Sequence, residues 1–166
     1  MGKIKVLIVD DHAILRMGLA SLLGTRKEVE VVGDAGNAAA AFRKIQRLKP
    51  DVVIMDLVMP GQDGIEATRN IRKDHPDVKV LILTTFGTSD GISRALDAGA
   101  GGAIMKNAPF PELVAAIKAT AEGKRYVSPE IEHILAEDPP IQELSPRQTQ
   151  ILELMVRGLS NHDIAT

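Results

Sequence analysis

The chain of 166 residues carries 20 Lys and Arg against 22 Asp and Glu, a formal net charge of −2, and 45% of its residues are hydrophobic. This composition is typical of a globular protein and excludes a disordered chain, which would be poor in apolar residues. No apolar run approaches the roughly 18 residues of a membrane span, the N-terminal apolar run is too short for a secretory signal, and cysteine is absent. The sequence therefore predicts a cytoplasmic protein with no membrane partner and no disulfide.

Short apolar runs rich in Val and Ile alternate with helical patterns along the first 122 residues. Four of the five runs are near-continuous in apolar residues, as in strands buried on both faces. The predicted strands are Ile4–Val9, Val29–Val32, Val52–Met55, Val78–Leu83 and Ala103–Met105. The predicted helices are Ala13–Leu23, Ala38–Leu48, Ile65–Lys73, Gly91–Ala98 and Phe110–Glu122. This alternation predicts an α/β fold, a doubly wound parallel sheet of five strands with helices on both faces.

Two local patterns refine the helix predictions. In the first helix, Ile14, Leu15, Leu19, Leu22 and Leu23 form one apolar stripe that should face the core. Asn37 and Ser89 stand where helices begin, and both are residue types that cap a helix N-terminus.

The regular alternation ends near Gly123. Residues 123–143 contain three prolines and only scattered apolar residues, which predicts a linker with one short helix from about Ser128 to Leu135. A new helix then begins with Ser145 as N-cap and Pro146 as its first residue. We expect Gly158 to end that helix and Ser160 to cap another, so residues 144–166 form the start of an all-α segment.

Charged and hydroxyl side chains follow the predicted strands at the points where the strands end. Asp10 and Asp11 end the first strand, Asp56 the third, Thr84 and Thr85 the fourth, and Lys106 the fifth. The carboxyl ends of parallel strands form the ligand crevice of an open sheet, so we expect these side chains to converge.

Crowded carboxylates need neutralisation, and Mg²⁺ provides it with oxygen ligands. The chemistry that this set suggests is phosphoryl transfer to a carboxylate, with Asp56 as nucleophile and Mg²⁺ held by Asp10 and Asp11. Lys106 and Thr84 would bind the remaining phosphoryl oxygens. The spacing to Lys106 favours Thr84 over Thr85 for this role.

These residues, with their neighbours, resemble the receiver domain of bacterial two-component response regulators over about residues 3–122, with a flavodoxin-like strand order of 2-1-3-4-5. The matching motifs are Val9-Asp10-Asp11-His12, Met55–Gly61 with Gly64, Leu83–Phe86 and Met105-Lys106. Leu144–Arg147 through Gly158–Ala165 resembles the start of a LuxR-type helix-turn-helix domain. Together they are similar to the NarL/FixJ subfamily of transcription regulators.

The resemblance implies a role for each residue. Asp56 would be the phosphoacceptor, with Mg²⁺ bound by Asp10, Asp11, Asp56 and the backbone carbonyl of Val58. Thr84 would move toward the phosphoryl group and Lys106 would pair with it, while Pro60 and Gly61 would form the adjacent turn. The phosphodonor would be a histidine kinase, a second copy of the chain is a further expected partner, and no small-molecule substrate is expected.

Two positions depart from the family pattern. Receivers usually carry an aromatic residue three positions before the lysine, where this chain has Ala103. Either the signal leaves the site by another route, or the switch is weak. Many relatives follow the lysine with Asp or Pro, whereas Asn107 stands here, which leaves open the path of the loop and any cis bond after Lys106.

The LuxR-type segment holds only the first helix and the start of the second, without the recognition helix that would enter the major groove. From Gly123 onward, four basic residues face seven acidic ones, a net charge of −3. Since a DNA-binding surface is basic, we expect specific DNA binding only from a complete protein.

Two alternative functions remain open. A degenerate receiver could act as a constitutive protein-interaction module, which Ala103 mildly favours. An aspartyl-phosphate hydrolase would need a second Asp two residues after the nucleophile, where this chain has Val58. The sequence therefore favours a regulator over an enzyme.

Overall fold

The computed structural model describes residues 2–85, 88–139 and 145–156. Its main element is a parallel sheet in the order β2-β1-β3-β6-β7-β8. The strands are β1 (Ile4–Val9), β2 (Val29–Ala35), β3 (Val52–Asp56), β6 (Lys79–Thr84), β7 (Gly102–Met105) and β8 (Tyr126–Val127). Between β3 and the next helix, β4 (Val58–Met59) and β5 (Gln62–Asp63) form a small antiparallel hairpin.

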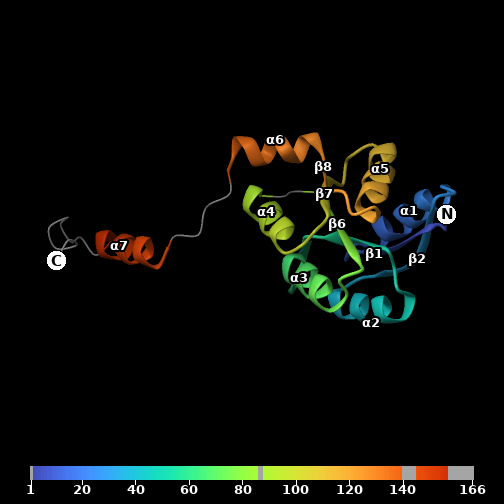
Figure 1. Cartoon of the computed structure of the whole chain (residues 1–166), viewed down its shortest axis with the longest axis horizontal. Coiled ribbons are helices and arrows are strands. Elements are labelled where there is room, and N and C mark those ends of the chain that lie inside the picture. The colour runs from blue at the N-terminus through green and yellow to red at the C-terminus, as the bar shows by residue number, and fades with distance from the viewer. Residues whose placement is uncertain (1, 86–87, 140–144, 157–166) are drawn as a thin grey trace.

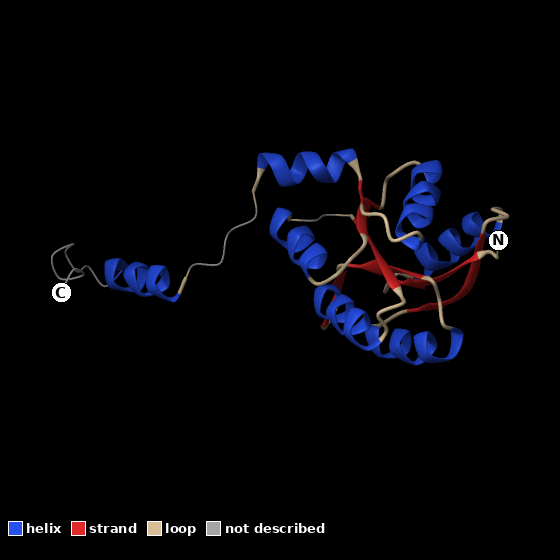
Figure 2. Ribbon diagram, in the orientation of Figure 1, coloured by secondary structure: helices blue, strands red, loops and turns tan. Residues whose placement is uncertain are grey.

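Helices cover both faces of this sheet (Figures 1 and 2). The helices are α1 (Ala13–Gly24), α2 (Ala38–Leu48), α3 (Gly64–Asp74), α4 (Ser89–Asp97), α5 (Phe110–Ala121), α6 (Pro129–Glu137) and α7 (Pro146–Val156). Helices α1 and α5 pack on one face, where Leu19, Leu23 and Ile117 lie in the core. Helices α2, α3, α4 and α6 contribute to the apolar cluster on the other face.

The central strands explain this three-layer arrangement. Every residue of β3 is buried, as is every residue of β7. Strands that are apolar on both sides can be buried only between two helical layers. The predicted α/β class and the order of the five predicted strands, now β2-β1-β3-β6-β7, are confirmed.

The structure adds a sixth strand to the five that were predicted. β8 pairs in parallel with β7, with Tyr126 opposite Gly102 and Val127 opposite Ala103. Residues 123–143 were expected to form a linker, yet part of this segment joins the sheet and the core. Two residues are too few to show an apolar period, so such a strand cannot be recognised from the sequence. β8 is defined only by its backbone pairing with β7. The domain boundaries at 3–122, 123–143 and 144–166 stay predictions.

The predicted helix starts are correct at one position and shifted at another. The Asn37 side chain accepts a hydrogen bond from the Ala40 amide and caps α2, as expected. The cap of α4 is Thr88 rather than Ser89, since the Thr88 hydroxyl accepts from the Gly91 amide. Ser89 is the first residue of the helix and is buried.

The predicted apolar stripe of α1 is wrong at two positions. Leu19 and Leu23 are buried, but Ile14 is 86% exposed and Leu22 is 49% exposed. Met17 is also largely exposed on the same helix. The periodicity indicated one apolar face, and α1 has more apolar surface than the sheet can cover.

The helix predicted after the linker is present as α7. Ser145 and Gln148 form a reciprocal cap, in which the Gln148 amide donates to the Ser145 hydroxyl and the Ser145 amide donates to the Gln148 side chain. No residue of α7 is buried, and Leu152, Met155 and Val156 are exposed. The expected roles of Gly158 and Ser160 fall outside the described residues. Within the part that the structure describes, no helix is long and apolar enough to cross a membrane.

Candidate functional site

Four neighbouring strands bring the predicted site residues to one edge of the sheet. Asp10 directly follows β1, Asp56 is the last residue of β3, and Thr84 is the last of β6. Lys106 directly follows β7, and its amide donates a 2.7 Å hydrogen bond to the Thr84 carbonyl. Because β1, β3, β6 and β7 are adjacent and parallel, their carboxyl ends meet at the same edge.

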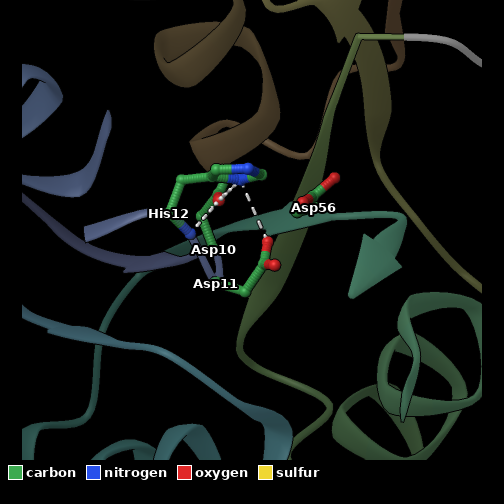
Figure 3. A group of neighbouring side chains, drawn as sticks. All are labelled: Asp10, Asp11, His12 and Asp56. Carbon is green, nitrogen blue, oxygen red and sulfur yellow. Dashed lines mark hydrogen bonds and ion pairs between the residues drawn. The ribbon is translucent and has the colours of Figure 1, made fainter. Parts of the chain in front are cut away.

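The acidic residues form a compact group at this edge (Figure 3). Asp10, Asp11, His12 and Asp56 each offer one ligand atom, and these atoms all lie within 4.8 Å of one another. Asp10 and Asp56 are almost completely buried, whereas the Asp11 side chain is about one quarter exposed. The group therefore lies at the bottom of an opening rather than inside the core.

Lys106 joins two of the carboxylates. Its Nζ lies 2.6 Å from Oδ2 of Asp10 and 3.3 Å from Oδ2 of Asp56. Burial alone would lower the pKa of Lys106, but its hydrogen bond to Asp10 and the charges of both carboxylates outweigh burial and raise the pKa. Lys106 is therefore held as a cation between the two carboxylates.

The two buried carboxyls respond differently to this environment. Burial raises the pKa of Asp10, but hydrogen bonds from Lys106 and His12 outweigh it, and the net pKa lies below its usual range. For Asp56 burial is again the largest influence; the Lys106 charge opposes it and the Asp10 charge reinforces it. The resulting pKa of Asp56 is raised above its usual range. Asp10 is thus the stabilised anion and Asp56 the destabilised one.

A cavity of about 380 Å³ opens beside Asp56, and His12, Val58, Thr84 and Thr85 complete its lining. Thr84 is 1% exposed, while Thr85 is exposed. Both predicted threonines therefore face the same space from different depths. Val58, the first residue of the hairpin, also reaches this cavity, and its amide donates a 3.3 Å hydrogen bond to Oδ1 of Asp56.

The remaining predicted residues, Pro60 and Gly61, lie in the turn between β4 and β5. Gly61 has a φ of +68°, which favours glycine. Neither residue lines the cavity beside Asp56. Gly64, at the start of α3, lies so close to the Asp56 backbone carbonyl that a Cβ would collide with it. The hairpin and Gly64 together place the chain after Asp56 against the site.

The donor set fits a hard divalent cation. Oδ1 of Asp11 is buried and accepts no hydrogen bond from any residue that the structure describes; the His12 Nδ1 atom lies 3.1 Å from it without forming one. An anionic oxygen left in this way is costly without a cation. Carboxylate oxygens are the ligands that Mg²⁺ prefers. Asp10, Asp11 and Asp56 supply them, and Val58 lies beside Asp56.

Two contributions to the site were not anticipated from sequence. Nη1 of Arg16, on α1, donates a 2.7 Å hydrogen bond to the Asp10 carbonyl, while its Nε donates to Asp34. The Gln62 side chain accepts a hydrogen bond from the Ala38 amide and so ties the hairpin to the N-terminus of α2. Neither pairing has a sequence signal, because each joins elements that only the fold brings together.

The sequence left open whether a cis peptide bond follows Lys106. The described residues contain no cis peptide bond, so the bond between Lys106 and Asn107 is trans. Ala108 donates its amide to the Met105 carbonyl, which turns the chain toward α5.

The comparisons with known proteins agree with this site. The family model of the response regulator receiver domain matches residues 6–118. The chain is 39% identical to the Response regulator protein VraR of Staphylococcus aureus over 168 aligned positions, covering 98% of this chain and 80% of VraR.

Solved structures give the same result. A LuxR-family two-component response regulator from Aurantimonas sp. SI85-9A1 shares 40% identity and a TM-score of 0.77 over 82% of this chain and 97% of that one. A complex of the response regulator RcsB with DNA shares 28% identity and a TM-score of 0.80, over 99% of this chain and 82% of that one.

The fold and its acidic edge thus define a receiver domain, the input module of two-component signalling. The chain belongs to the response regulator family and, within it, to the NarL/FixJ type with LuxR-like relatives. Members of this family act as regulators rather than typical enzymes, receive signals from histidine kinases, and use Mg²⁺ at the acidic pocket.

Proposed function

We propose that Asp56 accepts a phosphoryl group from a phosphohistidine of a histidine kinase, and that this switches a transcription-regulatory output. The observation that carries the proposal is the convergence of Asp10, Asp11 and Asp56 within 4.8 Å, with Lys106 Nζ 3.3 Å from Asp56. The carboxylates supply the negative charge that binds a divalent cation, and Lys106 supplies the positive charge that binds a phosphoryl group on Asp56.

The transfer forms one bond and breaks one. An Oδ atom of Asp56 forms a bond to phosphorus as the bond between phosphorus and the kinase imidazole breaks, and the imidazole keeps that electron pair. The cavity beside Asp56 leaves room for the incoming group. The raised pKa of Asp56 reflects an anion that its surroundings destabilise, which suits a carboxylate meant to react.

Asp10, Asp11, Asp56 and the backbone carbonyl of Val58 would hold Mg²⁺, which neutralises phosphoryl oxygens when bound. Lys106 would exchange its contact with Asp56 for one with a phosphoryl oxygen. The Thr84 hydroxyl, buried at the end of β6, would donate to another oxygen. Thr85 is exposed and is the weaker candidate for this role.

The output would be DNA binding by a complete LuxR-type domain, of which α7 is the first helix. The exposed Leu152, Met155 and Val156 of α7 support this interpretation, because a helix with an uncovered apolar face belongs against further helices. RcsB, one of the similar structures, has been solved as a complex with DNA.

A second copy of the chain is the partner that we propose for α1. A cavity of about 330 Å³ between α1 and α5 is lined mainly by apolar side chains, and the exposed Ile14 and Leu22 are among them. Apolar side chains gathered around a groove mark contact surfaces. RcsB dimers are seen on DNA in a similar structure.

The test is intact mass after incubation with Mg²⁺ and acetyl phosphate. We expect one added phosphoryl group on the wild type and none on Asp56→Asn or without Mg²⁺. Asp63→Asn is the matched control, because Asp63 is a nearby carboxylate that caps α3, a role that Asn also fills. It should accept the group like the wild type.

The mass measurement, together with an assay of phosphate-ester hydrolysis on the same proteins, separates the two alternative functions. A folded protein that binds Mg²⁺ but gains no phosphoryl group would favour a constitutive interaction module. Hydrolysis of small phosphate esters that depends on Asp56 would favour a hydrolase, which Val58 argues against because it cannot act as acid or base.

A further inference from the structure

The surface beside β7 is covered by the chain's own segment after α5, which contains β8 and α6. Helix α6 contacts both β7 and α4, and α6 lies beside α4 in Figures 1 and 2. Ile131 of α6 is completely buried, and Ile134 and Leu135 pack against the same apolar cluster. That cluster also contains Ile92 of α4 and Ala103 of β7. The helix is thus part of the core on this face.

Small residues in β7 make this docking possible. A Cβ on Gly102 would collide with the Tyr126 carbonyl, so only glycine lets β8 approach here. The Ala103 carbonyl accepts a 3.1 Å hydrogen bond from the Ser128 amide, which places the start of α6 directly beside it. Ala103 is fully buried although its side chain is a single methyl group. The position that lacks an aromatic ring is therefore the position on which the β8–α6 segment is anchored.

A second contact fastens the other end of α6. The Ser89 hydroxyl donates a 3.2 Å hydrogen bond to Oδ2 of Asp138, the residue that follows α6. Ser89 is buried in the first turn of α4, immediately after the capping residue Thr88. Thr84, the candidate switch hydroxyl, ends the strand that leads into this turn. The end of α6 is thus bonded to the element that directly follows the site.

We propose that α6 is the output element of the switch: it is held on α4 and β7 in the unphosphorylated protein and is released from α4 when Asp56 is phosphorylated. The inference rests on the proposed phosphorylation of Asp56. Movement of Thr84 toward the phosphoryl group draws the chain that leads into α4 with it. Ser89 then leaves Asp138, and the apolar contact between α4 and α6 loosens.

The position of α6 in the chain gives this release a consequence. Residues after Asp138 lead to α7, the first helix of the LuxR-type segment. While α6 is docked, the point from which that segment continues is fixed on the receiver. Once α6 is released, the segment can take orientations that the docked helix excludes. The signal thus travels along the main chain, with no side-chain rotation at position 103.

Hydrogen exchange of the full chain, measured by mass spectrometry, tests the proposal. The protein is compared with and without acetyl phosphate and Mg²⁺, and intact mass is read on the same samples. We expect the amides of residues 132–137 to exchange about tenfold faster in the phosphorylated protein, because local opening governs their exchange. The amides of α2 should not change.

Two variants isolate the contact with α4. Asp138→Ala removes the acceptor of the Ser89 hydroxyl and should speed exchange in α6 about threefold to tenfold without phosphorylation, as expected for one lost hydrogen bond. Glu137→Ala is the matched control, since Glu137 pairs with His133 within α6 and exposed pairs of this kind contribute little. It should change exchange much less.

Each outcome is decisive. Phosphorylation without faster exchange in α6 would overturn the release and leave the phosphoacceptor role intact. Failure to add a phosphoryl group would overturn the proposed function and the release with it. Equal exchange rates in Asp138→Ala and Glu137→Ala would show that the hydrogen bond from Ser89 to Asp138 does not fix α6 on α4.

Discussion

Acidic and basic side chains lie at both ends of the sheet, but their partners at the two ends differ. At the amino end, the Asp51 carboxylate accepts a 2.8 Å hydrogen bond from the Lys5 amide, and the Asp51 backbone is bonded to the neighbouring strands on both sides. Arg72 donates to the Pro76 and Val78 carbonyls and closes the turn before β6. The Asp51 and Arg72 side chains thus have neutral backbone partners and stabilise the fold.

At the carboxyl end, charges face charges. Asp10 and Asp56 share one lysine, and within the described part of the chain Oδ1 of Asp11 accepts no hydrogen bond. The comparison teaches that a carboxylate is recognised as functional by what surrounds it rather than by its presence. Buried carboxylates that crowd one another and are incompletely paired lower the stability of the fold. Their presence at this site points to a bound ligand that neutralises them.

The largest effect that would break this contrast comes from removing the shared cation. We expect Lys106→Met to lower the free energy of unfolding by about 3 kcal/mol, because it leaves two buried carboxylates without the cation that they share. Urea denaturation of the metal-free protein measures the loss. The double variant with Asp56→Asn should recover part of it. An unchanged midpoint in Lys106→Met would show that the carboxylates do not depend on the lysine.

The next effect has the opposite sign. Asp56→Asn should raise the free energy of unfolding of the metal-free protein by about 1.5 kcal/mol, a size common where a functional residue opposes folding. Mg²⁺ should stabilise the wild type more than the variant. Thermal unfolding with and without Mg²⁺ measures both. If the variant were less stable than the wild type, the Asp56 carboxylate would not be destabilising the folded protein.

The same residue gives a pH dependence. Because the pKa of Asp56 is raised in the folded protein, the unfolded chain loses this proton first as the pH rises from below 3.8. Asp56 therefore reduces stability as the pH rises from its ordinary pKa to its folded pKa. The stability advantage of Asp56→Asn should grow across that window and then level off. Urea midpoints of both proteins across that pH window test this.

At the amino end, a carboxylate should matter only for the fold. Asp51→Ala should lower the free energy of unfolding by about 1 kcal/mol, the contribution of one hydrogen bond. Its rate of phosphorylation by acetyl phosphate should equal that of the wild type. A slower rate would mean that the two ends of the sheet are coupled.

The smallest effect sharpens the contrast within the carboxyl end itself. Gln62→Ala removes the side-chain cap of Ala38, a contact between neutral groups, and should cost about 0.5 kcal/mol. Differential scanning calorimetry would detect it as a small decrease in the melting temperature. A loss as large as that of Lys106→Met would mean that the hairpin, rather than the charges, controls the stability of this edge.

The sequence predicted the sheet and the meeting of the site residues, because long apolar strands and the residues after them are local signals. It did not predict that Lys106 lies nearer to Asp10 than to Asp56, since that choice depends on side-chain packing. It missed β8 because two residues carry no period, and it assigned Ile14 to the core because periodicity does not measure how much surface a sheet can cover. The packing of α6 was hidden for a related reason: its apolar residues are few and lie in a segment rich in proline, which is typical of a linker.

The strands at the two borders of the sheet have a consequence for solubility. β8 contributes only two residues, and the pairing of β1 with β2 shifts register between Val6 and Leu7. A very short border strand and a border strand whose register shifts are both poor templates for another chain, so they disfavour aggregation by strand addition. A regulator that releases a helix to signal exposes apolar surface each time, and border strands of this kind make strand addition less favourable while that surface is exposed.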